Sequence, residues 1–333
     1  MAKNRTSQFR EVELSVIAVA AVVFALLRVG QVIPPPFVGT AEAAACPIID
    51  GGAGDDDASV NGTVTISGSK TFTAIAGTYD CTATPFHVTG TGTLVLDGNP
   101  ATGQIAQVAF GTLTVDIGGV VHSNSEGCAS GTNWSNVPNG SNVCVQTTDV
   151  AVYGSGAGGT GHGGAGGAGS TASGRGTYDS ATAPVLFGSS GGGTNQSITN
   201  GGAGGGVVRI TVTGTLTLNG TISADGGNGA INVGNAGGGG AGGSVYVTAG
   251  TINGTTGSFE AKGGNGADSS NDGGGGGGGR ISVNHGGGSF AFDSTDFNVA
   301  GGTAAGTATA GTKGTVYVKN TATNDVTIYH GFT

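Results

Sequence analysis

Charged and aromatic residues are scarce in this chain of 333 residues. Charged residues make up 9% of it and aromatic residues 6%, and there is a single tryptophan. The 11 lysines and arginines form no cluster, and the formal net charge is −9. A chain without a basic patch has no electrostatic footprint for a phosphate backbone or an anionic lipid surface. The composition therefore argues against nucleic-acid binding, and it leaves the N-terminal segment, if uncleaved, as the only expected membrane contact.

Residues that could carry chemistry are also few and scattered. The four cysteines form no Cys-x-x-Cys pair, and the five histidines show no metal-ligand spacing. The closest later pair of acids, Asp293 and Asp296, lies in a loop-like stretch without a neighbouring base, so we expect it to cap a turn. We therefore predict no catalytic residue, no metal and no cofactor, and we expect a protein that is not an enzyme.

Glycine, by contrast, is abundant. The chain contains 73 glycines, about a fifth of its length, against a usual share of about 7%. Between residues 154 and 167 glycine recurs at 158, 161, 164 and 167, which is a period of three. Runs with this period either pack as extended strands of the polyproline II type or stay floppy. The apolar stretch Pro184–Phe187 that follows favours docking of this segment on the rest of the chain.

A repeat organises the C-terminal half of the sequence. Residues 208–211 resemble residues 245–248, 37 positions later, and residues 221–229 resemble residues 258–266 at the same offset. Looser copies begin at Gly279 and Gly314. A fixed period of 20–50 residues indicates units that bury their apolar faces on one another.

Within each unit the apolar residues alternate, which predicts short strands with one buried face. Three such strands per unit, separated by glycine turns, predict an all-β fold in which stacked coils form a parallel β-helix, or β-solenoid. In this register Asp225 and Lys262 occupy matching places, so we expect an ion pair between neighbouring coils. Arg209 and Arg280 begin strands that we take as equivalent, and we expect them to form a ladder on the outer face.

The N-terminal segment has the features of an export signal. Basic residues precede an apolar run from Leu14 to Leu27, which predicts a hydrophobic helix. Fourteen residues are short for a membrane span and suit a signal peptide, with cleavage near Ala44 or Cys46. An uncleaved membrane anchor is the alternative.

An even number of cysteines in an exported chain predicts disulfides. Cys128 and Cys144 bracket a polar loop that a disulfide would staple, and Cys46 and Cys81 are left as the second pair. We divide the chain into a signal peptide or anchor (1–45), N-terminal coils with a disulfide-bearing loop (46–153), a glycine-rich insertion (154–206) and C-terminal repeats (207–333).

Several motifs resemble those of a known group of proteins. His162-Gly163-Gly164, the stretch 187–192, and Gly-Gly-Asn-Gly joined through glycines to residues 244–247 resemble the glycine-rich repeats of large bacterial and archaeal surface proteins. These are adhesin-like or autotransporter-passenger-like chains. The resemblance covers roughly residues 55–330, implies a right-handed parallel β-helix at a cell surface, and brings no catalytic residues with it.

The sequence thus favours a non-enzymatic, secreted, extracellular structural or adhesin-like protein. Its expected partners are surface glycans, neighbouring surface proteins or further copies of itself. Two alternatives stay open. A carbohydrate-active β-helix enzyme, a polysaccharide lyase or hydrolase, would need clustered carboxylates beside a base. A filament subunit would need exposed strand edges.

Overall fold

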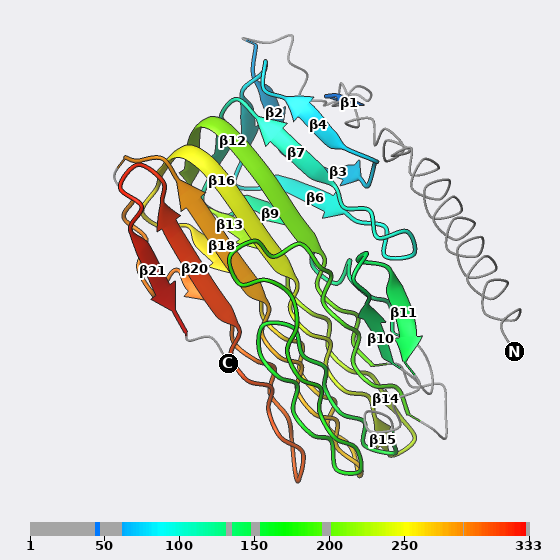
Figure 1. The fold of residues 1–333 in the computed structure, drawn as a ribbon. Coiled ribbons are helices and arrows are strands. Elements are labelled where there is room, and N and C mark those ends of the chain that lie inside the picture. Colours follow the sequence, from blue (N-terminus) through cyan, green and yellow to red (C-terminus); the bar gives the residue numbers. More distant parts are fainter. Residues whose placement is uncertain are drawn as a thin grey trace, which may run out of the picture. The chain divides into compact units, whose positions relative to one another are not determined.

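The computed structural model describes residues 44–46, 62–130, 135–147, 154–194, 201–288 and 290–330. In these residues the long regular elements are all β-strands, which confirms the all-β class (Figure 1). The expected hydrophobic helix over Leu14–Leu27 lies outside the described residues. None of the described segments forms a helix long and apolar enough to cross a membrane.

Two largely parallel sheets contain most of the strands. In the first sheet the order is β1-β4-β7-β12-β16-β18-β20-β21, and β2, β5 and β8 join it beside β12. These strands are β1 (Ala44–Ala45), β2 (Val64–Ile66), β4 (Thr78–Cys81), β5 (Phe86–Val88), β7 (Gln107–Phe110), β8 (Leu113–Val115), β12 (Val207–Leu218), β16 (Ser244–Asn253), β18 (Arg280–His285), β20 (Thr315–Asn320) and β21 (Val326–Tyr329).

The second sheet has the order β19-β17-β13-β9-β6-β3. Its strands are β3 (Ser69–Thr73), β6 (Thr93–Asp97), β9 (Val120–His122), β13 (Thr221–Ser223), β17 (Ser258–Glu260) and β19 (Phe297–Asn298). The remaining strands form two small antiparallel pairs. These are β10 (Ser135–Pro138) with β11 (Cys144–Thr147), and β14 (Ile231–Asn232) with β15 (Asn235–Ala236).

The strand pairing follows the repeat that the sequence predicts. Val208 pairs with Val245, Val245 with Ile281, and Ile281 with Val316, all in parallel. In the second sheet residues 221–223 pair with residues 258–260. The predicted register is therefore confirmed in both sheets, and between residues 207 and 298 each passage of the chain adds one strand to each sheet.

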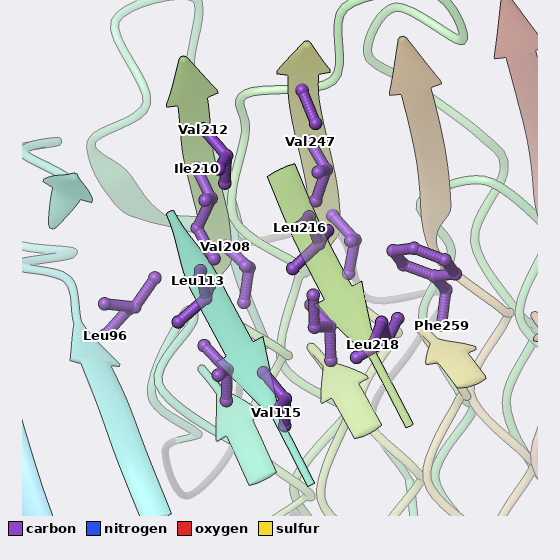
Figure 2. Packing of buried hydrophobic residues seen from close by; sticks show 14 of the residues in the cluster. Leu96, Leu113, Val115, Val208, Ile210, Val212, Leu216, Leu218, Val247 and Phe259 are labelled. Carbon is purple, nitrogen blue, oxygen red and sulfur yellow. The ribbon is translucent and has the colours of Figure 1, made fainter. Parts of the chain in front are cut away.

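The core lies between the two sheets because alternate residues of each strand point inward. Figure 2 shows Ile210, Leu216 and Val247 from the first sheet and Phe259 from the second turned toward one interior, and all four are at most 1% exposed. Fully burying a side chain of this size contributes roughly 1.5–3 kcal/mol. The alternation of polar and apolar residues thus fixes which face of each sheet is covered.

Three short strands per coil are present before residue 123, as in β7, β8 and β9, whereas the C-terminal repeats differ from this expectation. The first two predicted strands merge into the long strand β12, in which the register shifts between Val212 and Thr215. After β13 the chain leaves the sheets in two extended glycine-rich segments before it returns as β16 (Figure 1). We call the set of such segments the glycine bundle; it comprises residues 154–177, 187–194, 201–206, 224–229, 236–243, 261–267, 272–279, 299–303 and 309–314.

Hydrogen bonds in the glycine bundle repeat every three residues. In segment 272–279 the N–H groups of Gly274 and Gly277 donate to residues 157 and 160, which belong to one neighbouring segment. Those of Gly275 and Gly278 donate to a second neighbour at 309 and 312, and those of Gly276 and Gly279 to a third at 264 and 261. Three residues per turn is the period of the polyproline II helix. The period-three glycines therefore pack as extended strands and are not floppy.

Glycine is required where these segments touch. A Cβ atom on Gly239 would lie 1.9 Å from the carbonyl oxygen of Gly264, and one on Gly275 would lie 2.0 Å from that of Gly302. Real Cβ atoms do not approach backbone atoms so closely, so side chains would push the segments apart. The high glycine content thus reflects close backbone packing.

Side-chain ladders explain why Gly-Gly-Asn-Gly recurs at the same place in successive repeats of the chain. The Asn228 Oδ1 atom accepts the N–H of Asn265, and the Asn265 Oδ1 atom accepts the N–H of Thr303 in the following coil. Asp225 likewise accepts the N–H of Lys262 at a distance of 2.7 Å. These residues lock consecutive coils in register where the sheets give way to the glycine bundle.

Candidate functional site

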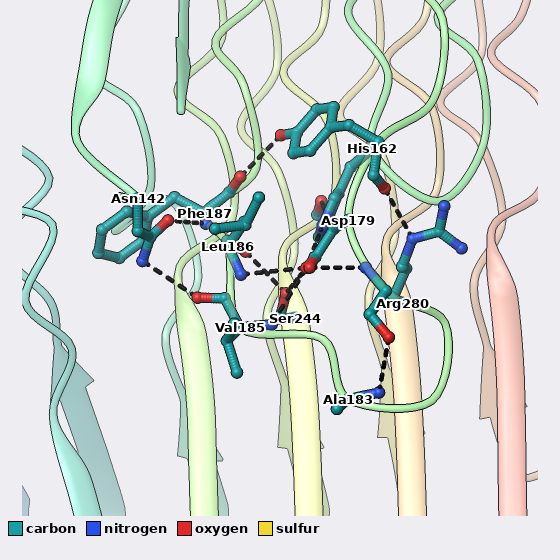
Figure 3. Close-up of polar contacts among 12 residues, drawn as sticks. Asn142, His162, Asp179, Ala183, Val185, Leu186, Phe187, Ser244 and Arg280 are labelled. Carbon is teal, nitrogen blue, oxygen red and sulfur yellow. Dashed lines mark hydrogen bonds and ion pairs between the residues drawn. The ribbon is translucent and has the colours of Figure 1, made fainter. Parts of the chain in front are cut away.

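A short segment crosses the outer face of the first sheet. We call residues 178–186 the strap. Ser244 and Ser282 lie on strands β16 and β18, on the face opposite the core. The Ser244 hydroxyl donates to the carbonyl of Leu186 (Figure 3), and the Ser282 hydroxyl donates to that of Thr182. Arg280 donates from Nε to the carbonyl of Tyr178 at 2.8 Å. The strap is therefore anchored at both ends and in its middle.

Asp179 is the centre of these contacts. Its backbone has a φ of 72°, a region that non-glycine residues seldom adopt. Its Oδ2 atom accepts the N–H groups of Val185 and Leu186 at 3.1 and 3.0 Å, and the Ser244 hydroxyl lies 3.3 Å away. The carboxylate thereby folds the strap back on itself and fixes it to β16.

His162 approaches Asp179 from the glycine bundle. Its side chain is fully buried, with Nδ1 2.8 Å from the carbonyl oxygen of Gly242 and Nε2 3.1 Å from Asp179 Oδ2. Both ring nitrogens of His162 therefore face oxygen atoms that can accept a hydrogen bond.

Burial alone would raise the pKa of Asp179. The hydrogen bond and charge of His162, together with the N–H groups of Leu186 and Ser180, outweigh burial and hold the pKa below its ordinary value. We call His162, Asp179 and Arg280 the clasp. Both ring nitrogens and both carboxylate oxygens of the clasp have protein partners, so its geometry suits attachment of the strap better than proton transfer to a substrate.

The expected arginine ladder is wrong. Arg209 pairs with Tyr246, and Tyr246 pairs with Ser282, whereas Arg280 pairs with Ser244. The two arginines therefore lie in different rows of the sheet. Arg209 stacks over the ring of Tyr246, 5.7 Å from its centroid, while Arg280 is only 6% exposed and binds Thr315 as well as the strap. Both arginines stand near the start of a strand, but the register of the repeat, and not the start of the strand, sets the row in which a residue lies.

The expected pair of Asp225 and Lys262 is present. Lys262 Nζ lies 3.2 Å from Asp225 Oδ2, and it also contacts Glu260. Burial raises the pKa of Asp225, and the contacts with Lys262 offset only part of this effect. This network joins two neighbouring coils, which agrees with the predicted register.

The sequence did not predict that the carboxyl groups of Glu126 and Asp97 interact. Partial burial, followed by the charge and hydrogen bond of Asp97, raises the pKa of Glu126.

Asp293 and Asp296 cap a turn as expected, since Asp293 Oδ1 accepts from Thr295 and Asp296 Oδ2 from the N–H of Asp293. In the described part of the chain, no three or more His, Cys, Asp or Glu side chains come together as a metal site.

Both disulfides join the cysteines that the sequence pairs, Cys46 with Cys81 and Cys128 with Cys144. The first ties β1 to β4 at the N-terminal edge of the sheet. The second attaches the β10–β11 hairpin to the rest of the chain beside the buried ring of Phe187.

A pocket of about 450 Å³ opens next to the clasp. Its walls include Val137 and Pro138 of the hairpin, Arg175, Gly176 and Tyr178 beside or within the strap, and Ser189 of the glycine bundle. Sequence patterns did not indicate this pocket, because its residues come from three segments that are brought together only by folding. Three of the nine lining residues are glycines, which carry no side-chain signal.

Comparisons of the chain with family models, with curated proteins and with solved structures find no match.

Proposed function

We propose that this chain is a non-enzymatic, exported protein that acts outside the cell as a rigid structural or adhesin-like scaffold. The proposed architecture is a right-handed parallel β-helix whose coils continue into the glycine bundle. Parallel pairing at a nearly constant offset of about one coil supports this architecture. The proposed segmentation of the chain at residues 45, 153 and 206 belongs to the same hypothesis.

The observation that carries the proposal is the hydrogen bonding of the glycine bundle. Ordering glycine costs more entropy than ordering any other residue, so a chain with 73 glycines needs many compensating backbone contacts to be rigid. The bundle provides them, because N–H groups three residues apart along a segment donate to the same neighbouring segment. Two disulfides fit an oxidising, extracellular location. Rigidity, few charges and export suit a scaffold that carries loops at a cell surface.

Surface labelling of intact cells tests this proposal. The full chain, expressed with its own N-terminus in an exporting bacterium, should react with an impermeant amine reagent and resist external protease. Its four cysteines should be unreactive toward alkylation before reduction, because all four are paired. A chain that stays inside the cell with reduced cysteines would refute the proposal.

The filament alternative is favoured by one observation. Strand β21 lies at the edge of the first sheet and leaves Val326 and Ile328 48% and 46% exposed. Exposed edge strands are templates for pairing with another chain. Sedimentation velocity of the full chain distinguishes the two functions, since a filament subunit assembles with increasing concentration and the double variant Val326→Lys/Ile328→Lys would not.

A further inference from the structure

The pocket beside the clasp has the size of a small-ligand site. Its volume of about 450 Å³ lies within the usual range for such sites, roughly 300–1,000 Å³. One or two sugar residues fill a space of this order. The walls come from the hairpin, the strap and the glycine bundle, so the pocket forms where three separately anchored segments meet.

Backbone donors line this pocket without a protein acceptor. In the described part of the chain the N–H groups of Gly161, Gly174, Gly176 and Thr177 donate no hydrogen bond, although their neighbours in the glycine bundle do. Gly161 is buried, and a buried N–H without an acceptor is rare in folded proteins. A ligand that presents several oxygen atoms would satisfy these donors.

Tyr178 gives the pocket a fixed aromatic wall. Its N–H donates to His162, its carbonyl accepts from Arg280, and its hydroxyl donates to the carbonyl of Phe187 at 2.7 Å. Its ring lies 4.7 Å from that of His162. Because its polar groups are used inside the protein, Tyr178 offers a ligand mainly its ring, and Val137 and Pro138 add further apolar surface.

Oxygen atoms for backbone donors and C–H faces for an aromatic wall are combined in sugars. We propose that this pocket binds one or two residues of a saccharide, either neutral or carrying a carboxylate. The lining contains no carboxylate of the protein, although the chain as a whole is acidic, so the pocket repels neither kind of sugar. The inference rests on the proposed surface function and specifies its ligand class.

Filling the pocket provides a matched test. A Cβ atom on Gly176 would meet nothing within 4 Å, and the same holds for Gly68, a residue outside the pocket lining. Gly176→Trp should therefore fold and block the pocket, while Gly68→Trp adds the same side chain elsewhere. Calorimetric titration of the full chain with cellobiose, maltose, chitobiose and digalacturonate gives the readout.

We expect at least one of these probes to bind the wild type and the Gly68→Trp variant equally, and to bind Gly176→Trp about tenfold more weakly or not at all. Binding of a neutral disaccharide or of digalacturonate alone would identify the kind of sugar. Should Gly176→Trp melt earlier than Gly68→Trp, Thr177→Trp, at an exposed lining residue, replaces it.

The inference is overturned if none of the four probes binds, or if a bound probe binds the pocket-filled variants as tightly as the wild type. Either result would leave the scaffold proposal intact, because surface exposure and protease resistance do not depend on this pocket. Conversely, sugar binding by a chain that is never exported would support the pocket and refute the surface function.

Discussion

Glycines inside the glycine bundle should tolerate no side chain. Gly239→Ala places a Cβ against the Gly264 carbonyl, where only backbone could yield. Overpacking of this kind costs about 1–3 kcal/mol, so we expect a loss of about 2 kcal/mol in the free energy of unfolding. Gly176→Ala, which meets open space, should change it by less than about 1 kcal/mol and in the stabilising direction. Urea denaturation of both variants measures the difference; equal values would mean that the bundle is not closely packed.

Glu126 should weaken the fold at neutral pH. Its raised pKa means that the unfolded chain releases the proton at a lower pH than the folded chain does. Stability therefore falls as the pH rises through this interval and stays lower above it. Glu126→Gln should raise the melting temperature at pH 7 and have no such effect at pH 3, where both states are protonated. A variant less stable than the wild type at pH 7 would contradict a Glu126 pKa raised by burial and by the charge of Asp97.

At the scale of elements, the strap depends on the clasp. Asp179→Asn removes the carboxylate that faces His162 and accepts three backbone N–H groups, and removing one partner of a buried, hydrogen-bonded pair of this kind costs roughly 3 kcal/mol. The pair of His87 and Asp116, 2.7 Å apart and with side chains 35% and 43% exposed, is the more solvated control. Asp116→Asn should cost less than about 1 kcal/mol. Thermal unfolding at pH 7 measures both, and equal losses would contradict the role of the clasp.

The pH dependence of the strap follows from the lowered pKa of Asp179. The stability it contributes is fully present above the ordinary pKa of an aspartate, about 3.9, and is lost as the pH falls through the lower, folded value. Hydrogen exchange of the Val185 and Leu186 amides should therefore lose protection in acid before the sheet amides do. Strap amides that stay protected until global unfolding would show that Asp179 does not hold the strap.

The sequence specified the sheets better than it specified the glycine bundle or the clasp. Residues 208–211 and 245–248 carry side chains whose alternation sets both register and buried face, so their pairing could be predicted. A glycine segment has no side chain to choose a partner, so the sequence gives its period but not its neighbours. His162 stood out in its glycine run, yet its partners lie 17 and 80 residues away and only folding brings them together.

At the scale of the whole molecule, a coil that contacts only the neighbouring coils transmits little to distant ones. The effect of a change on unfolding should therefore depend on whether the change lies at the end or in the interior of the stack. The disulfide between Cys46 and Cys81 closes a separation of 35 residues, and that between Cys128 and Cys144 closes 16. From chain entropy alone, the disulfide that closes the longer loop should stabilise the fold more, by about 4 kcal/mol against about 3 kcal/mol for the shorter loop. However, β1 lies at the edge of the sheet, and in the described residues it pairs with β4 through Ala44 and Ala45. In a fold with nearest-neighbour contacts, a change at the end is felt mainly at the end.

We therefore expect the disulfide that closes the shorter loop to contribute more to the main unfolding transition, which is the opposite of what loop length alone predicts. Replacing Cys128 and Cys144 by alanine should lower the main unfolding transition by about 3 kcal/mol, because the hairpin is tied to the interior beside Phe187. Replacing Cys46 and Cys81 should leave that transition nearly unchanged and release only the β4 amides to faster hydrogen exchange. Calorimetry combined with exchange measures both effects. If the terminal pair proves the more costly to the main transition, the coils unfold as one cooperative unit and not by nearest-neighbour contacts.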